Sequence, residues 1–170
     1  MTASRRVGTA RSDVVGSLLR PAYLREARRG VREGRVSDAE LHAAEDRAVR
    51  EAIELQEKAG LDVITDGELR RQSWVVTIPL REEGAFHAPL AGYEFLPAEP
   101  GWWSLWKEPD GWRAQVWTAP TRPFVTKPLE VARDIVAEEY AFLKANAHHR
   151  TKFTIPAPSW HRIFWHPEHS

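Results

Sequence analysis

The stretch QEKAGLDVITDGE, residues 56–68, contains the end of a helix, a stop, a strand and a polar turn in direct succession. Gly60 is typical of the left-handed residue that ends an α-helix. The run from Leu61 to Thr65 is rich in apolar and β-branched residues, which indicates a strand. Asp66, Gly67 and Glu68 follow that strand without a spacer. This order of elements is typical of parallel α/β proteins.

A strand and a short helix are predicted near the start of the chain. The strand covers residues 11–15. Pro21 suits the first turn of the helix, because its missing N–H would have no partner there. We expect this helix to direct Leu24 and Ala27 inward and to end near Gly30.

A longer helix is predicted before residues 61–68, and it ends within the stretch quoted above. Ser37 and Glu40 have the spacing of a capping box, in which the serine accepts from an exposed N–H and the glutamate reaches back. The residues that follow form one apolar stripe at spacings of three and four: Leu41, Ala44, Ala48, Ala52, Leu55 and Ala59.

The α/β pattern resumes after residue 127. A third helix is predicted from Pro128 to about Ala147, and a third strand at residues 152–155. Strand, helix and strand in succession predict a parallel sheet with a right-handed crossover. The inward face of the third helix is expected to hold Leu129, Ala132, Ile135, Val136, Tyr140 and Leu143.

The section from about 79 to 126 interrupts this pattern and is rich in proline and tryptophan. The turn signal at 109–111 separates two aromatic runs, residues 102–107 and 112–117. These runs predict an antiparallel hairpin inserted into a single domain that spans residues 1–170. The tryptophans either cover a ligand or pack the insertion onto the framework, and packing is the favoured interpretation.

Composition limits the possible functions. The 170 residues are fewer than the ~250 of a complete eight-stranded barrel. The formal net charge is zero, so no overall field favours nucleic acid or an acidic membrane. The basic run at 25–35 is interrupted by Glu26 and Glu33, which favours a solvated face over a phosphate site. The absence of cysteine excludes disulfides and thiolate metal ligands, and no apolar run reaches membrane-spanning length. A cytoplasmic protein is expected.

Three predicted strands end in short turns, at residues 16–17, 66–68 and 158–159. Strand ends of this kind share one side of a parallel α/β fold, where ligands bind. Gly16 and Ser17 offer a hydroxyl and N–H groups to a carboxylate. Asp66 and Glu68 can bind an ammonium group, hold a hard metal or divide acid and base roles. The structural alternative is a helix cap paired with Arg70 or Arg71, which is favoured for Asp66.

A histidine-rich segment lies at positions 161–169. His161, His166 and His169 stand near Glu168, a composition that permits metal binding. Their spacing fits no helical face, and Pro167 interrupts it. We therefore predict no metal site in this chain.

Taken in order, these motifs resemble the catalytic domain of the cobalamin-independent methionine synthase family. The resemblance covers residues 13–170, and the tryptophan-rich section is its least diagnostic part. It rests on VGSLLRP at 15–21, Glu45-Asp46, QEKAGLDVITDGELRR at 56–71, Trp74 and IPAPS at 155–159.

The resemblance implies the N-terminal portion of a TIM (β/α) barrel of the methionine synthase and uroporphyrinogen decarboxylase type. In that family zinc activates homocysteine as a thiolate, which takes a methyl group from a folate donor. Gly16 and Ser17 match the turn that holds the amino acid, and Glu68 matches the glutamate that binds its ammonium. Val14 stands where many members have histidine. The implied zinc ligands, including a cysteine, lie on later strands and are not in this chain.

Three functional hypotheses follow. The chain is a methyltransferase segment, inactive until it is joined by a complementary C-terminal half. Alternatively, it belongs to a related thiol alkyltransferase of the coenzyme M type on the same scaffold, and Glu68 then lacks an ammonium partner. The third hypothesis is a non-catalytic truncated half-barrel, whose exposed strand edge favours self-association.

Overall fold

The computed structural model describes residues 11–71, 90–97, 101–108, 111–117, 121–131, 133–157, 159 and 164–170. They divide into two compact units. Unit 1 holds the described parts of Met1–Trp74 and Ile135–Thr154, and unit 2 those of Val75–Asp134 and Ile155–Ser170. None of the described helices has the length and apolar character of a membrane span.

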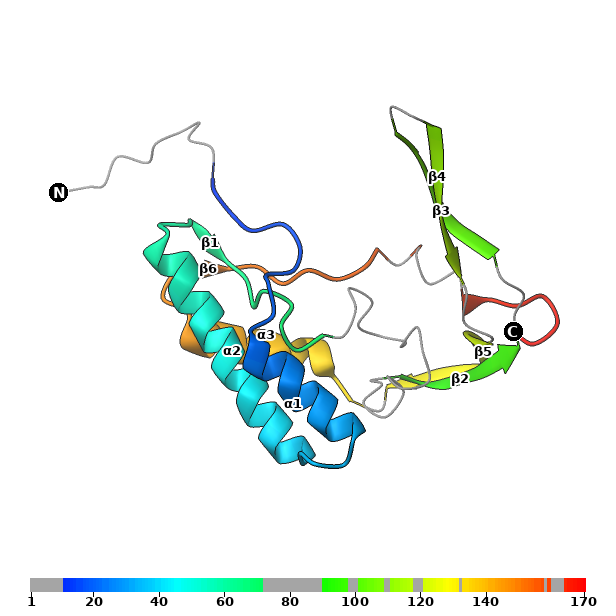
Figure 1. Ribbon diagram of the computed structural model, residues 1–170, viewed down its shortest axis with the longest axis horizontal. Coiled ribbons are helices and arrows are strands. Elements are labelled where there is room, and N and C mark those ends of the chain that lie inside the picture. Colours follow the sequence, from blue (N-terminus) through cyan, green and yellow to red (C-terminus); the bar gives the residue numbers. More distant parts are fainter. Residues whose placement is uncertain are drawn as a thin grey trace. The chain divides into compact units, whose positions relative to one another are not determined.

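Unit 1 combines three helices with short parallel strands (Figure 1). The helices are α1 (Ala22–Arg32), α2 (Asp38–Lys58) and α3 (Ile135–Asn146). The strands are β1 (Val63–Ile64) and β6 (Arg150–Thr151). Helix α2 packs against both α1 and α3 and also contacts β1.

The strands of unit 1 lie in chain order. Val63 pairs in parallel with Arg150, and an isolated parallel bridge joins Asp13 to Val63 on the other side. The predicted parallel arrangement is confirmed. The strands are shorter than expected, and the third one pairs at 150–151 rather than at 152–155. The Lys152 N–H still donates to the carbonyl of Ile64 at 2.9 Å, which keeps the following residues beside β1.

Helix α2 begins as its sequence predicts. Ser37 and Glu40 form the complete capping box, which satisfies N–H groups at the exposed helix end. The predicted apolar stripe is only partly right, because Leu55 is 62% exposed. The buried face instead includes two polar residues that find partners. Glu45 pairs with Arg28 at 3.1 Å, and the Gln56 side chain hydrogen-bonds both the N–H and the carbonyl of Thr65.

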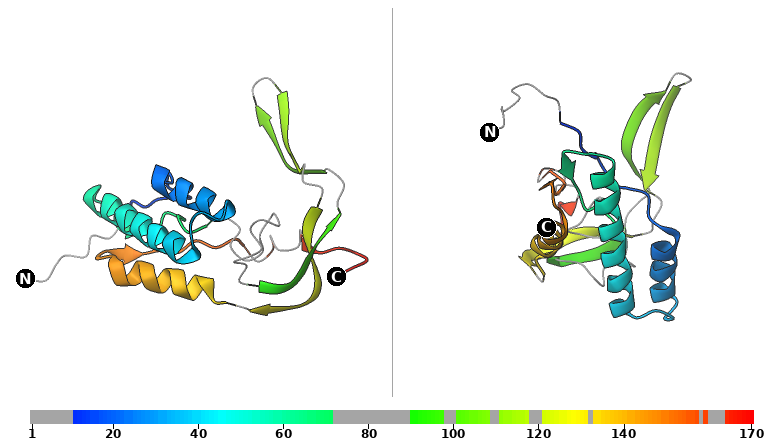
Figure 2. Two further views of the ribbon diagram at one scale, coloured as in Figure 1. Left: turned by 60° about the horizontal axis from the view of Figure 1, so that its bottom comes forward. Right: turned by 90° about the vertical axis from the view of Figure 1, so that its left-hand side faces the viewer.

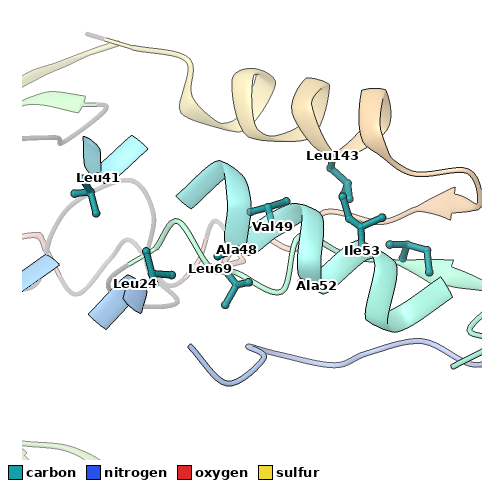
Figure 3. Packing of buried hydrophobic residues seen from close by; sticks show 9 residues of the cluster. Leu24, Leu41, Ala48, Val49, Ala52, Ile53, Leu69 and Leu143 are labelled. Atoms are coloured by element: carbon teal, nitrogen blue, oxygen red, sulfur yellow. The ribbon is translucent and has the colours of Figure 1, made fainter. Parts of the chain in front are cut away.

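The core of unit 1 lies between the three helices and the strand layer (Figure 3). Leu24 of α1, Val49 of α2 and Leu143 of α3 are almost fully buried. Burial of each such side chain contributes about 1.5–3 kcal/mol of transfer free energy. The full cluster is Leu24, Leu41, Ala48, Val49, Ala52, Ile53, Ile64, Leu69 and Leu143.

Helix α1 continues past its expected end at Gly30 and stops at Arg32. Gly30 is buried within the last turn, and its carbonyl accepts the N–H groups of Arg35 and Val36. A Cβ on Gly30 would lie only 2.4 Å from the Val36 side chain. The glycine therefore permits close packing of the chain reversal and does not end the helix.

The prediction that Pro128 starts the third helix is wrong, because Pro128 lies in a strand and α3 begins at Ile135. The pairing of that strand is irregular at this point, next to Gly92. A Cβ on Gly92 would lie 2.4 Å from the Pro128 carbonyl oxygen. A bulge tolerates proline because the ladder needs no N–H there.

The described strands of unit 2 form two antiparallel pairs (Figure 2). Strand β2 (Leu90–Pro97) pairs with β5 (Thr121–Val131). Strand β3 (Gly101–Glu108) pairs with β4 (Gly111–Trp117), and these strands carry the two aromatic runs. No sequence pattern predicted the β2–β5 pairing. The expected turn residues Pro109 and Asp110 lie outside the described part of the chain.

Candidate functional site

Glu68 is a buried carboxylate held by hydroxyl groups from two distant parts of unit 1. Only 6% of the residue is exposed. Ser17 Oγ donates to Oε2 at 2.6 Å, and Thr154 Oγ1 donates to Oε1 at 2.9 Å. Arg71 Nη1 lies 3.6 Å from Oε1. Two distant segments therefore converge on the carboxylate that a third segment carries, and all three follow the parallel pairings of unit 1.

The turn that carries Glu68 has an uncommon backbone. Gly67 has φ 66°, and Glu68 itself has φ 54°, in the left-handed region that costs a non-glycine residue energy. The turn is fixed because Asp66 Oδ1 accepts the Glu68 N–H at 3.0 Å. Thr65 Oγ1 accepts the Gly67 N–H at 3.2 Å, and the Gly67 carbonyl accepts the Leu18 N–H at 3.0 Å. Strain of this kind is typical of functional sites.

Arg71 lies among three carboxylates, and we call Asp66, Glu68, Arg71 and Glu139 the Arg71 cluster. The Arg71 side chain is 2% exposed. Nη2 is 3.9 Å from Asp66 Oδ2, and Nε is 3.6 Å from Glu139 Oε2. The guanidinium also lies over the ring of Phe153 at 4.4 Å, a cation–π arrangement. One cation therefore faces three acids, which favours protonation of part of the cluster.

Two of these acids have raised pKa values. Burial raises the pKa of Glu139 to about 7, although Arg71 opposes the shift. Burial also raises the pKa of Asp66, again opposed by Arg71. Both shifts follow from the cost of burying a charge. Proton uptake at Glu139 and Asp66 reduces the negative charge that Arg71 must balance.

Two arginines of unit 1 fix the backbone after Glu68. Arg20 Nη2 and Arg28 Nη1 donate to the carbonyl of Arg71 at 2.8 and 3.0 Å. Arg28 Nη2 donates to the carbonyl of Leu69 at 2.6 Å. Burial, followed by repulsion from Arg28, lowers the pKa of Arg20. These contacts hold the Glu68 turn against α1.

Of the predicted site residues Gly16, Ser17, Asp66 and Glu68, the structure joins Ser17 and Asp66 to Glu68 by hydrogen bonds. Gly16 has φ 83°, which suits glycine. The Ser17 hydroxyl donates to Glu68 and the Leu18 N–H donates to the Gly67 carbonyl, so both of these donors are engaged within unit 1.

Sequence reasoning missed Thr154 and Glu139. Glu139 is buried on α3, whose predicted inward face did not include it, and Thr154 follows β6 in the chain. Of the predicted strand-end turn at 158–159, Pro158 lies outside the described residues and Ser159 belongs to unit 2.

Unit 2 contains a separate cluster of potential metal ligands, in the segment His166–Ser170 that we call the histidine turn. His166, Glu168 and His169 offer ligand atoms within 4.8 Å of one another. His161 lies outside the described residues. The turn is held by the Ser170 N–H, which donates to the His166 carbonyl at 2.9 Å, and by the His166 ring, edge-on to Phe124.

The histidine turn does not fit the zinc site that the family resemblance implies. It has no thiolate, and the whole sequence has no cysteine. The Glu168 N–H donates to His166 Nδ1 at 3.1 Å. A backbone N–H can only donate, so the neutral ring carries its proton on Nε2 and offers no free lone pair. Among the described residues this is the group that could hold a metal, and its ligation would require that hydrogen bond to break.

Comparison with known proteins identifies the family. A family model described as "Cobalamin-independent synthase, Catalytic domain" matches residues 10–88, a range that includes Ser17 and Glu68. The methionine synthase of Sulfurisphaera tokodaii is 32% identical over 146 residues. The chain belongs to the cobalamin-independent methionine synthase catalytic-domain family. The match to the Sulfurisphaera enzyme covers 85% of this chain and 37% of that protein, so the chain spans well under half of its relative.

Further relatives agree with this family assignment. A 5-methyltetrahydropteroyltriglutamate–homocysteine methyltransferase of Syntrophotalea carbinolica is 37% identical over 97 residues, which cover 57% of this chain and 12% of that protein. A solved structure, the putative vitamin-B12 independent methionine synthase of Listeria monocytogenes, matches with a TM-score of 0.62 at 24% identity. That match covers 95% of this chain and 40% of the other, and it confirms the α/β fold class of the TIM-barrel type.

Proposed function

We propose that this chain is the N-terminal portion of a methyltransferase barrel and that it binds the amino-acid end of a homocysteine-like thiol. On this proposal residues 1–170 form one domain, with the tryptophan-rich hairpin of about 79–126 as an insertion. The complete enzyme transfers a methyl group from a folate donor to the thiol. The buried Glu68 carboxylate, oriented by two hydroxyls, is the observation that carries the proposal.

The chemistry of Glu68 suits an ammonium group. A carboxylate has about four acceptor positions, of which Ser17 and Thr154 occupy one on each oxygen. An ammonium donates three N–H bonds, and a charge-assisted bond to a buried carboxylate is about twice as strong as a neutral one. Arg71 stays 3.6 Å away, beyond direct hydrogen-bond distance, so it does not replace the ligand cation.

The thiol and methyl-donor ends of the reaction are assigned to residues outside this chain. Zinc in the family stabilises the thiolate nucleophile, and this sequence has no cysteine to serve as one of its ligands. On this proposal Gly16, Ser17 and Glu68, with Asp66 fixing the turn, contribute binding and orientation of the amino acid. The isolated chain is therefore expected to be inactive and to bind the ligand weakly.

The test is calorimetric titration of the purified chain with L-homocysteine and with 4-mercaptobutanoic acid, which has the same thiol and carboxylate but no amino group. We expect a preference for homocysteine, and we expect Glu68→Gln to weaken homocysteine binding by roughly 30-fold or more, since a buried charge pair is lost. Glu54→Gln, on the exposed side of α2, is the matched control.

Two outcomes would contradict the proposal. Equal affinity for the two thiols would mean that Glu68 does not bind an ammonium. Tighter binding of coenzyme M, a thiol without an amino group, would favour the alkyltransferase alternative. Metal analysis of the same sample separates these outcomes from an effect of zinc.

A further inference from the structure

We infer that Thr154 is a positioning residue, whose hydroxyl holds the Glu68 carboxylate in the orientation that binds the ammonium of the ligand. This inference rests on the proposed function. Thr154 Oγ1 lies 2.9 Å from Glu68 Oε1, on the carboxylate oxygen that Ser17 does not contact. The two hydroxyls therefore constrain both carboxylate oxygens.

The segment that carries Thr154 is anchored on several sides. The Lys152 N–H donates to the Ile64 carbonyl at 2.9 Å, beside β1. Lys152 Nζ donates to the Val14 carbonyl at 3.0 Å and pairs with Asp13, next to the first strand. Phe153 packs edge-on against Tyr140 of α3. Fixed neighbours of this kind hold a side chain within the tolerance that a binding site needs.

Competition with Arg71 explains why Glu68 needs this contact. Arg71 Nη1 is 3.6 Å from the same oxygen that Thr154 contacts, slightly beyond a hydrogen bond. Without the Thr154 hydroxyl, Oε1 loses its hydrogen-bond donor. The Arg71 guanidinium is then the donor group at hand, 3.6 Å away. A small rotation of Glu68 would then form a direct pair with Arg71. The carboxylate would turn away from Ser17 and from the ligand.

Threonine is suited to this role. Its two heavy atoms on Cβ restrict χ1, so little freedom is lost when the hydroxyl is placed. Valine has nearly the same shape and no donor, which makes Thr154→Val a sharp substitution. Serine restores the donor and lacks the methyl group. Thr151, whose hydroxyl donates to Tyr140 Oη at 3.2 Å, supplies a matched control on the same segment.

The experiment measures the ratio of affinities for L-homocysteine and 4-mercaptobutanoic acid by calorimetry on the full chain. Thr154→Val is expected to reduce that ratio about tenfold, the loss of one hydrogen bond to a charged group. Thr154→Ser and Thr151→Val are expected to keep it within about twofold. A purely structural role for Thr154 would weaken the binding of both thiols equally and leave the ratio unchanged.

The outcomes separate this inference from the proposed function. If Glu68→Gln removes the preference and Thr154→Val retains it, the inference is wrong and the proposed function stands. If the unchanged chain shows no preference, the proposed function fails, and unfolding temperatures of both single variants and of the double variant decide whether Thr154 holds Glu68. If the unfolding temperature of the double variant falls by less than the sum of the falls in the two single variants, the contact is supported. If the two falls simply add, the inference is overturned.

Discussion

The Arg71 cluster and the histidine turn each bring titratable side chains together, but they differ in how they are built. The Arg71 cluster draws its members from the turn after β1 and from α3, and its guanidinium is 2% exposed. The histidine turn takes its three residues from one local segment, and Glu168 and His169 are exposed. Long-range convergence and burial in the first cluster shift pKa values, as Glu139 shows.

This difference separates two kinds of proximity. Residues that are neighbours along a turn are brought together by local backbone geometry, and water screens their charges. Residues that come from separate elements into a buried cluster must be balanced by charge and hydrogen bonds, or folding is opposed. A cluster of the second kind is the better candidate for a site with a chemical role.

The largest expected effect comes from removing the central cation. Arg71→Met leaves Asp66, Glu68 and Glu139 without the charge that faces all three, and we expect a loss of about 3–5 kcal/mol in the free energy of unfolding at pH 8. The loss should be smaller at pH 5, because Glu139 then holds a proton. Urea unfolding measures both values. An equal effect of His169→Ala would remove the distinction between the two clusters.

The next effect is a dependence of stability on pH. The folded pKa of Glu139 is about 7 and its ordinary value is 4.5, so folding takes up a proton between these values. The associated stability is present below pH 4.5 and is lost as the pH rises through 7, by about 3 kcal/mol in total at 1.36 kcal/mol per unit. The raised pKa of Asp66 acts in the same direction.

Glu139→Gln should flatten this pH profile, because the amide stays neutral at every pH. Unfolding free energies measured from pH 4.5 to 8 test this. Glu54→Gln, at an exposed position, should leave the slope unchanged. An unaltered slope in Glu139→Gln would show that Glu139 stays ionised in the folded chain and that the cluster is balanced otherwise.

Local signals allowed part of this structure to be predicted. The capping box at Ser37 and the turn after β1 depend on residues that are close in sequence, and both are present. Thr154 and Glu139 reach Glu68 and Arg71 only after a crossover that includes unit 2, so no local pattern identifies them. The prediction that Pro128 starts a helix failed for a related reason, because the bulge beside Gly92 that accommodates this proline depends on strand pairing.

A smaller effect is expected at the glycine of the Glu68 turn. Gly67→Ala forces a left-handed conformation on a residue with a side chain, and its Cβ would lie 3.1–3.3 Å from Leu18. We expect a loss of about 2 kcal/mol, of which roughly half is backbone strain. Gly34→Ala has a similar φ and no atom within 4 Å of the added Cβ, so it isolates that strain. Equal losses would mean that Leu18 yields without cost.

The smallest effect is expected when zinc is added, because the histidine turn must break a hydrogen bond before it can bind a metal. The His166 lone pair at Nδ1 is engaged by the Glu168 N–H, and the other nitrogen of the neutral ring carries a proton. We therefore expect micromolar zinc to raise the unfolding temperature by no more than about 1 °C, since a ligand stabilises only in proportion to its binding. His169→Ala should give the same response. If the chain instead binds one zinc ion and His169→Ala abolishes that binding, local proximity alone is enough to form a site here. The contrast with the Arg71 cluster would then fail.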